Sequence, residues 1–298
     1  MNPESSKALI VGILNLNKPI GLTSRDAVDF VSRPLRKLKV GHAGTLDPLA
    51  SGVLVLCLGG ATRLIEYVQR MPKTYRTVIR LGATSDTLDA DGQVVETPNP
   101  TIPQEHDVRS AMARQVGVIQ QIPPQFSALK VAGQRAYDLA RAGETVDLAA
   151  REVSIHRIDL ISYEWPRLEL EIDCGSGTYI RSIARDLGET LGCGGLVEVL
   201  TRTRIGVFTL ADAVDPTRFD GPDSILSHLR PPLDALGDLP RTTLDPAQLA
   251  LIVQGRAISI VNQVAGEVVL LASDGSLAAI GEADPVSGLV APRRVFSV

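Results

Sequence analysis

An aspartate in a glycine-rich loop is the residue of this sequence best suited to carry out chemistry. Asp47 lies in the stretch GHAGTLDPLASG, residues 41–52, and an apolar run, residues 53–58, follows directly. Glycines permit positive φ angles and close approach by another molecule, and Pro48 fixes φ and removes one donor. The stretch therefore predicts a stiff loop that holds one carboxylate near the surface. An ordinary turn, in which the aspartate caps its own backbone, is the alternative interpretation.

Other kinds of chemistry find less support in the residue types. The four histidines are dispersed without the spacing of metal ligands, so we expect no metal site (His42, His106, His156 and His228). No Gly-Lys dipeptide occurs, which excludes a Walker nucleotide site. Three cysteines without a C-x-x-C pair are typical of reduced thiols in a cytosolic protein.

The elements that must position the loop follow from periodicity and from turn residues. A strand is expected over residues 8–16, and Thr23 and Asp26 predict a capping box at the start of a helix. The buried face of that helix is predicted to hold Ala27, Phe30 and Val31. Further strands are predicted over residues 53–58, 73–82, 151–163 and 167–174, with short ones near 256–261, 266–272, 276–282 and 289–297. Further helices are predicted over residues 104–116, with Val108, Met112 and Val116 on one side, over 133–143, and over 244–254, closed by Gly255.

Length and charge limit the classes of protein to which this sequence can belong. The 298 residues, 44% hydrophobic and 21% charged, suit one large domain, or a large and a small one, of an ordinary globular protein. No apolar run of about 18 residues occurs, and the polar first residues do not resemble a signal peptide. The net charge of −4 is uneven: residues 1–80 carry 12 Lys and Arg against 5 Asp and Glu. Four cations, Arg33, Arg36, Lys37 and Lys39, precede the loop and favour a polyanionic substrate, although a solvated helix end fits them too.

The whole loop sequence is more specific than its aspartate. GHAGTLDPLASG resembles the catalytic loop of the TruB family of pseudouridine synthases, which isomerise one uridine in the T-loop of tRNA. The resemblance extends over about residues 8–210 in the family's order. Its other motifs are KPIGLTS at 18–24, KTYRTVIRLG with DTLDADG at 73–92, PPQFSALK at 123–130, GTYIR at 177–181 and the segment 197–206.

The resemblance implies a reaction and a set of roles. The N1–C1′ bond of uridine breaks, the uracil rotates, and the base rejoins through C5, without redox change or cofactor. Asp47 is then the essential carboxylate, and Arg181 is the cation that pairs with it and lowers its pKa. Tyr75 lies against the base and is the expected proton acceptor. The remaining substrate-binding candidates are Tyr179 and Leu200 in the pocket, His42 beside the flipped nucleotide, and Lys18 on phosphate or bracing the loop.

Two rival functions remain to be weighed. A glycosidase also uses an aspartate nucleophile but needs a second carboxylate, and we expect none in the other pocket-forming motifs. A non-catalytic RNA-binding protein or tRNA chaperone would use the same surface.

The expected architecture is α+β: a pseudouridine-synthase-like mixed, mostly antiparallel sheet with flanking helices, plus a small C-terminal β-rich, PUA-like domain. The boundaries expected are residues 1–235 for the catalytic domain, with an RNA-clasping insertion at about 120–150, and 236–298 for the RNA-binding domain. The expected partner is the T-arm of tRNA in the cytoplasm, with neither a membrane nor an obligatory protein partner.

Overall fold

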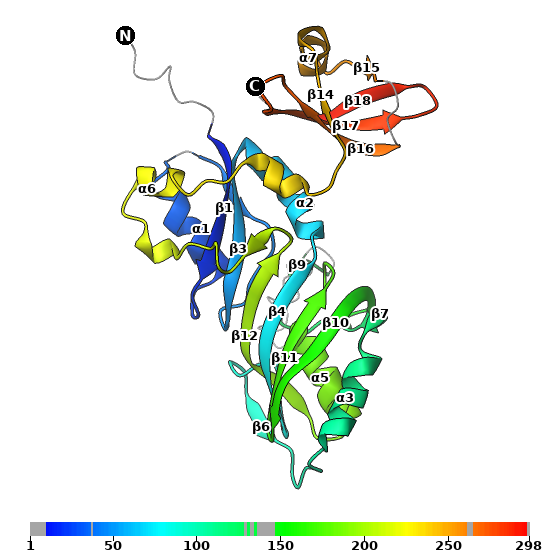
Figure 1. Cartoon of the computed structure of the whole chain (residues 1–298). Coiled ribbons are helices and arrows are strands. Elements are labelled where there is room, and N and C mark those ends of the chain that lie inside the picture. The colour runs from blue at the N-terminus through cyan, green and yellow to red at the C-terminus, as the bar shows by residue number, and fades with distance from the viewer. Residues whose placement is uncertain are drawn as a thin grey trace.

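The structure is a computed structural model that describes residues 10–36, 38–127, 130–131, 134–135, 147–260 and 265–296. Figure 1 shows an elongated molecule in which a long central sheet carries helices on its sides and a smaller sheet lies at one end. None of the described helices is long and apolar enough to cross a membrane. The mixed, mostly antiparallel sheet that the sequence predicts is confirmed.

The central sheet, as described, has nine strands, of which seven follow the order β1-β3-β12-β4-β11-β10-β7, while β2 pairs with β3 and β13 with β12. Their bounds are β1 (Val11–Lys18), β2 (Val40–His42), β3 (Ala50–Gly59), β4 (Lys73–Leu81), β7 (Gly117–Gln121), β10 (Arg151–Glu164), β11 (Arg167–Cys174), β12 (Gly195–Ile205) and β13 (Phe208–Thr209). Neighbouring strands are antiparallel except that β12 runs parallel to β3. This parallel pair joins the strand after the Asp47 loop to the strand that carries Leu200.

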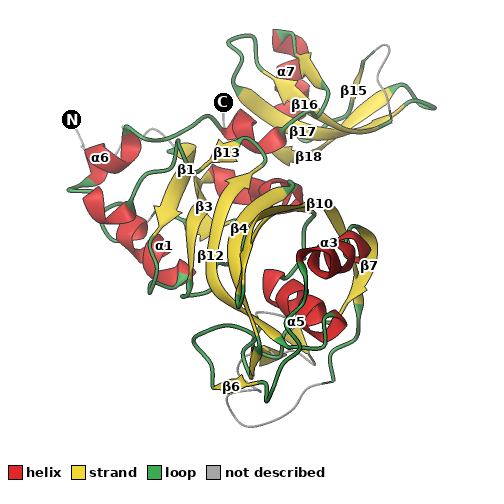
Figure 2. Cartoon of the chain, turned by 60° about the horizontal axis from the view of Figure 1, so that its bottom comes forward, coloured by secondary structure: helices red, strands yellow, loops and turns green. Residues whose placement is uncertain are grey.

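The strands of the central sheet carry buried apolar side chains, and helices cover these side chains. Figure 2 shows α3 (Glu105–Arg114) and α5 (Ile180–Thr190) inside the curve of strands β4, β11 and β10, with α1 (Ser24–Ser32) beside β1 and β3. Shorter helical segments are η1 (Gly60–Leu64), α2 (Ile65–Arg70), η2 (Pro216–Arg218), α6 (Pro222–Leu226) and η3 (Pro232–Leu236). Two small hairpins are formed by β5 (Ala83–Ser85) with β6 (Val94–Glu96) and by β8 (Lys130–Val131) with β9 (Gln134–Arg135).

The C-terminal residues form a second sheet with the order β14-β16-β17-β18-β15. Its strands are β14 (Arg241–Thr243), β15 (Ile258–Ser259), β16 (Gly266–Leu271), β17 (Leu277–Asp284) and β18 (Leu289–Val295), and α7 (Pro246–Val253) accompanies them. Gly255, at φ +78°, ends α7 as expected. One hydrophobic cluster joins this sheet to the first one, because Val269 and Ile280 pack with Val53 and Tyr67.

Three details of the helix predictions need correction. Phe30 is 41% exposed, and the buried face of α1 is formed instead by Ser24, Ala27, Val28 and Val31. Val116 is exposed because α3 ends at Arg114, two residues before it. Within the predicted helix 133–143, residues 134–135 form strand β9, and the rest lies outside the described residues. The capping box of Thr23 and Asp26 is confirmed.

Candidate active site

The loop that carries Asp47 is fastened on both sides of the aspartate. The hydroxyl of Ser24, the first residue of α1, accepts from the Leu46 N–H at 2.8 Å and donates to the Leu46 carbonyl at 3.0 Å. On the other side, the N–H of Gly21 donates to the carbonyl of Pro48 at 2.8 Å. The capped start of α1 and the turn before it therefore hold the backbone around Asp47, so its carboxylate has a fixed place.

A buried arginine connects this carboxylate to a second one. Arg181, in the first turn of α5, places Nη2 2.8 Å from Oδ2 of Asp47 and Nη1 3.3 Å from Oδ2 of Asp89. The same guanidinium donates to the backbone carbonyls of Thr87 and Phe126, each at 2.9 Å. Four acceptors on three segments thus fix its plane.

Asp89 was not expected at this site, since no second carboxylate was predicted among the pocket-forming motifs. It is 4% exposed, and its other carboxylate oxygen accepts from Thr87 and from the N–H of Asp91. Asp89 lies behind Arg181 and is not among the residues that line the cavity. A general acid must reach the leaving group of its substrate. Because Asp89 is buried, it acts as a partner of Arg181 and does not reach a substrate. The second reactive carboxylate that a glycosidase needs is therefore not supplied by Asp89.

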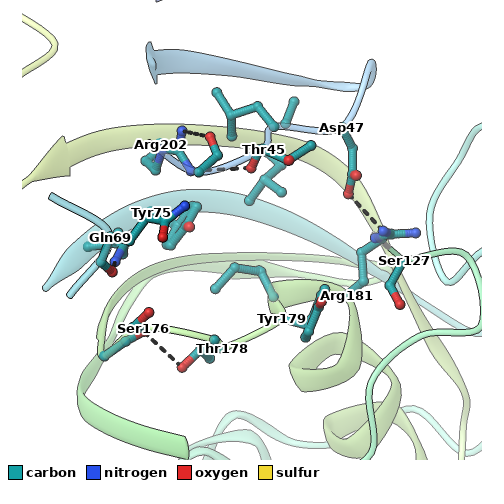
Figure 3. A pocket seen from close by; sticks show the side chains of 18 of the residues that line it. Thr45, Asp47, Gln69, Tyr75, Ser127, Ser176, Thr178, Tyr179, Arg181 and Arg202 are labelled. Atoms are coloured by element: carbon teal, nitrogen blue, oxygen red, sulfur yellow. Dashed lines mark hydrogen bonds and ion pairs between the residues drawn. The ribbon is translucent and has the colours of Figure 1, made fainter. Parts of the chain in front are cut away.

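Asp47 opens onto a cavity of about 300 Å³. The carboxylate points into it from one wall, and Tyr75 and Tyr179 come from other elements (Figure 3). Its lining residues are Ala43, Gly44, Thr45, Leu46, Asp47, Ala50, Gln69, Lys73, Tyr75, Ser127, Gly175, Ser176, Gly177, Thr178, Tyr179, Ile180, Arg181, Leu200 and Arg202. A cavity of this size and mixed polarity suits one nucleobase with its sugar.

Apolar and aromatic side chains supply the flat walls. Tyr75 on β4 is 8% exposed and Leu200 on β12 is 6% exposed, and both face the cavity. Tyr179 directly precedes α5, so its ring lines the cavity near Arg181. The structure thus brings together five of the predicted site residues, Asp47, Tyr75, Tyr179, Arg181 and Leu200, from separate motifs.

Two predicted residues lie outside this lining. Lys18 is fully buried, and its Nζ donates to the carbonyls of Pro19 at 2.9 Å and Leu22 at 2.6 Å. Burial lowers the pKa of Lys18 to about 8, opposed by the charge of Asp47. A phosphate contact by Lys18 does not fit this position, whereas bracing the turn before α1 does. His42, in β2, is half-buried and does not line the cavity.

Arg202 is a pocket residue whose place in the site was not predicted. It is 2% exposed, and its guanidinium donates to the carbonyls of Val53 at 2.8 Å, Gly44 at 3.2 Å and Thr45 at 3.4 Å. It therefore joins β12 to the Asp47 loop. The signal was present in the sequence, because side chains alternate along a strand and Arg202 must share the inward face of Leu200.

Lys73, at the start of β4, also lines the cavity. Its Nζ donates to the carbonyls of Gln69 and of Met71, the latter at 2.6 Å. Burial, together with the nearby charge of Arg202, lowers the pKa of this ammonium to about 8. The cavity therefore has cations on several sides.

Burial changes the expected protonation of the two reactive side chains. Burial raises the pKa of Asp47 above its usual value, Arg181 opposes this shift, and the charge of Asp89 adds to it. The sequence-based expectation of a lowered pKa was wrong, because desolvation outweighs the charges of Arg181 and Lys18. Burial likewise raises the pKa of Tyr75, while Arg202 opposes the shift. The phenol of Tyr75 is therefore neutral, so it must lose its own proton before it can accept one.

In the part of the chain that is described, no three His, Cys, Asp or Glu side chains lie close enough together to hold a metal ion. The arrangement offers instead a carboxylate, a buried guanidinium and an aromatic wall around a cavity of nucleoside size. Such a set can attack or deprotonate a bound electrophile and stabilise negative charge that develops on it.

The fold of this chain is shared with chains of solved RNA–protein and protein assemblies. The chain superposes on a protein of a Cbf5–Nop10–Gar1 complex with a TM-score of 0.69, at 24% identity over 91% of this chain and 78% of the other. It also superposes on a chain of an H/ACA RNP bound to a substrate RNA containing 2′-deoxyuridine, with a TM-score of 0.70 at 21% identity, covering 96% and 85%. At these identities the likeness defines the class of fold alone.

Sequence comparison defines the family. Residues 32–180 match the TruB family pseudouridylate synthase N-terminal domain, and residues 181–220 match the tRNA pseudouridylate synthase B C-terminal domain. The tRNA pseudouridine synthase B of Aromatoleum aromaticum is 41% identical over 98% of this chain and 94% of that protein. That of Cereibacter sphaeroides is 42% identical over 97% of both. The chain therefore belongs to the TruB family of pseudouridylate synthases.

Proposed function

We propose that this protein isomerises uridine to pseudouridine in tRNA, at position 55 of the T-loop, with Asp47 as the essential carboxylate. The observation that carries the proposal is the pairing of Asp47 with Arg181 at 2.8 Å at the wall of a nucleoside-sized cavity. The curated relatives, named tRNA pseudouridine synthase B, support the choice of reaction and of tRNA as substrate.

The roles in this reaction follow from the geometry. The N1–C1′ bond of uridine breaks, a C5–C1′ bond forms, the C5 proton passes to solvent, and N1 takes up a proton, so the product is an isomer of the substrate. The ionised carboxylate of Asp47 attacks the flipped nucleotide or stabilises and deprotonates an intermediate. Arg181 keeps that carboxylate oriented, and Tyr75 and Leu200 hold the base between them. A uridine in a folded loop must leave its stack to enter the cavity, at about a few kcal/mol.

We further propose that residues 1–235 form the catalytic domain and residues 236–298 a PUA-like RNA-binding domain. The separate sheet β14–β18 supports the boundary. Arg241 and Arg256, like Arg293, are exposed cations on this domain that could contact phosphate. Reversing both charges with Arg241→Glu and Arg256→Glu should weaken tRNA binding and reduce its salt dependence, with turnover at saturating tRNA unchanged. Unchanged affinity would contradict an RNA-binding role for this domain.

The central test measures pseudouridine in an unmodified tRNA transcript after incubation with the purified protein. Carbodiimide-based detection reports the position, and release of tritium from C5 of uridine reports the rate. The Asp47→Asn variant should lose turnover while it still binds tRNA, and Asp91→Asn, an exposed neighbour of the same charge type, serves as control. Unchanged turnover in Asp47→Asn would refute the role of Asp47. Wild-type protein that binds tRNA and makes no pseudouridine would favour the non-catalytic alternative.

The proposal places the reaction in the cytoplasm, with the T-arm as the contacted part of tRNA and no obligatory protein partner. Turnover by the purified chain alone, on a minimal T-arm hairpin, tests the last two points together. A need for added cell extract would contradict the absence of a partner.

A further inference from the structure

The segment between β7 and residue 127 is bound along its length to the beginning of α5. The hydroxyl of Ser182, itself fully buried, donates to the carbonyl of Ile122 at 2.8 Å, and Arg185 donates to the same carbonyl at 3.1 Å. Further along, the carbonyl of Phe126 accepts from Arg181. These contacts form a seam, residues 121–127 against residues 179–185, directly beside the cavity.

Gln121 begins this seam and contacts Tyr179, which lines the cavity. It is the last residue of β7, is 1% exposed, and pairs its amide with both backbone groups of Tyr179. Its Oε1 accepts from the Tyr179 N–H at 2.8 Å, and its Nε2 donates to the Tyr179 carbonyl at 3.2 Å. A buried amide with satisfied donor and acceptor is costly to replace, because removing it leaves the Tyr179 N–H without a partner, although the Tyr179 carbonyl still accepts from the Ile183 N–H at 3.2 Å.

The residue that Gln121 holds is at a sensitive place. Tyr179 directly precedes α5, with φ −106° and ψ 113°, and no side chain caps this end of the helix. Its ring lines the cavity, and Arg181 follows two residues later. A small rotation of the backbone at Tyr179 therefore moves the aromatic wall and displaces the partner of Asp47.

We propose that Gln121 is a positioning residue for the isomerisation, acting through the backbone of Tyr179 to place the Tyr179 ring and the Arg181 guanidinium against the bound uridine. This inference rests on the proposed function. Gln121 does not line the cavity, so its role is to orient the residues that do. Misplacement of a reacting group by about 1 Å can lower a rate by about 100-fold.

The first experiment compares Gln121→Met with Gln120→Met, which alters the exposed neighbour on the same strand. Single-turnover release of tritium from C5 of uridine gives the rate, and filter binding gives the tRNA Kd. We expect Gln121→Met to lower the rate at least 10-fold, with Kd within about twofold of wild type, and Gln120→Met to match wild type in both. An unchanged rate, or a rate loss that saturating tRNA restores, would overturn the proposal.

Two further variants distinguish a positioning role of Gln121 from a merely structural one. Ser182→Ala removes the adjacent hydrogen bond of the seam without touching Tyr179, so it should lower Tm but leave the rate near that of wild type. Tyr179→Ala removes the ring but keeps the backbone that Gln121 holds, so adding Gln121→Met should still lower the residual rate, by a smaller factor than in wild type, because only Arg181 remains to be displaced. Equal rate losses in both backgrounds would contradict placement of the Tyr179 ring by Gln121.

Gln121→Glu covers the case in which Gln121→Met does not fold. This variant keeps the shape and the acceptor for the Tyr179 N–H but loses the donor to the Tyr179 carbonyl, so we expect an intermediate rate at unchanged Kd. A wild-type rate in a folded Gln121→Glu protein would count against the proposal. Wild-type protein without any turnover would refute the proposed function itself, whereas an active wild type with active Gln121 variants would refute this inference alone.

Discussion

The guanidinium of Arg181 is buried, whereas the carboxylate of Asp47 that pairs with it at 2.8 Å is partly exposed to the cavity. The exposed fractions of the two side chains are 6% and 38%. The Arg181 guanidinium therefore lies in the protein interior, whereas the Asp47 carboxylate is accessible from the cavity. Because Arg181 also pairs with buried Asp89, its charge stays compensated when Asp47 engages a substrate. A buried cation left without a partner would be strongly destabilising.

Replacing the buried carboxylate should lower activity. In Asp89→Asn, Arg181 keeps Asp47 and two carbonyls but loses its second anion, so its plane is less well fixed. We expect a single-turnover rate about 10- to 100-fold lower, with tRNA affinity retained. Asp91→Asn, in the same turn but exposed, is the matched control. An Asp89→Asn enzyme as fast as wild type would show that orientation of Arg181 does not limit the reaction.

The dependence of the rate on pH should reveal the raised pKa of Asp47. Burial, with a contribution from Asp89, holds this pKa above the ordinary 3.8 of aspartate. The reactive form is the carboxylate, so activity should fall as the pH drops through a midpoint above 3.8. Removing the negative charge of Asp89 lowers the pKa of Asp47 and should move that midpoint to lower pH. Single-turnover rates measured from acidic to neutral pH test both statements, and a midpoint at or below the ordinary value would contradict them.

Arg202 should matter for stability and for the Asp47 loop together. Arg202→Met removes the donor to the buried carbonyl of Val53 and to the part-buried carbonyls of Gly44 and Thr45. We expect the free energy of unfolding to fall by about 2–4 kcal/mol, and the rate to fall as well because the loop is released. Arg204→Met, two residues further on the same strand but part-exposed and paired with Asp173, should cost about 0.5 kcal/mol or less. Equal unfolding midpoints in urea for the two variants would contradict the role of Arg202.

Gly52 should be intolerant of any side chain. Its φ is +100°, and a Cβ there would lie 2.3 Å from the carbonyl oxygen of Arg202, across the parallel pairing of β3 and β12. Gly52→Ala should therefore lower the free energy of unfolding by about 2–4 kcal/mol, from strain and from the displaced strand. Gly21→Ala has a similar φ, +87°, but open space around it, so about 1–2 kcal/mol is expected. Thermal unfolding of both variants tests this, because Gly21→Ala reports the backbone strain alone and Gly52→Ala reports the strain together with the steric clash.

Motif order and alternation predicted much of this protein. The strands over 73–82, 151–163 and 167–174 were predicted almost to the residue, and the first and last of these alternate between a buried and a more exposed face. The capping box at Thr23 and the stop at Gly255 are local signals that the structure confirms. The resemblance in the loop at Asp47 was sufficient to indicate the family.

Long-range geometry decided what local patterns do not encode. The pairing of Arg181 with Asp89 arises because α5 packs on β12, and Asp89, in the turn after β5, pairs with Val197 of the same strand. No spacing rule connects residues so distant in the chain. The burial of Lys18 and the raised pKa of Asp47 likewise depend on what the rest of the chain packs around them, since desolvation is a property of the assembled interior. The sequence alone determined the reactive residue types and the elements that carry them. Only the tertiary structure decided which charges face the cavity, which support them from behind, and that Gln121 holds the backbone of Tyr179.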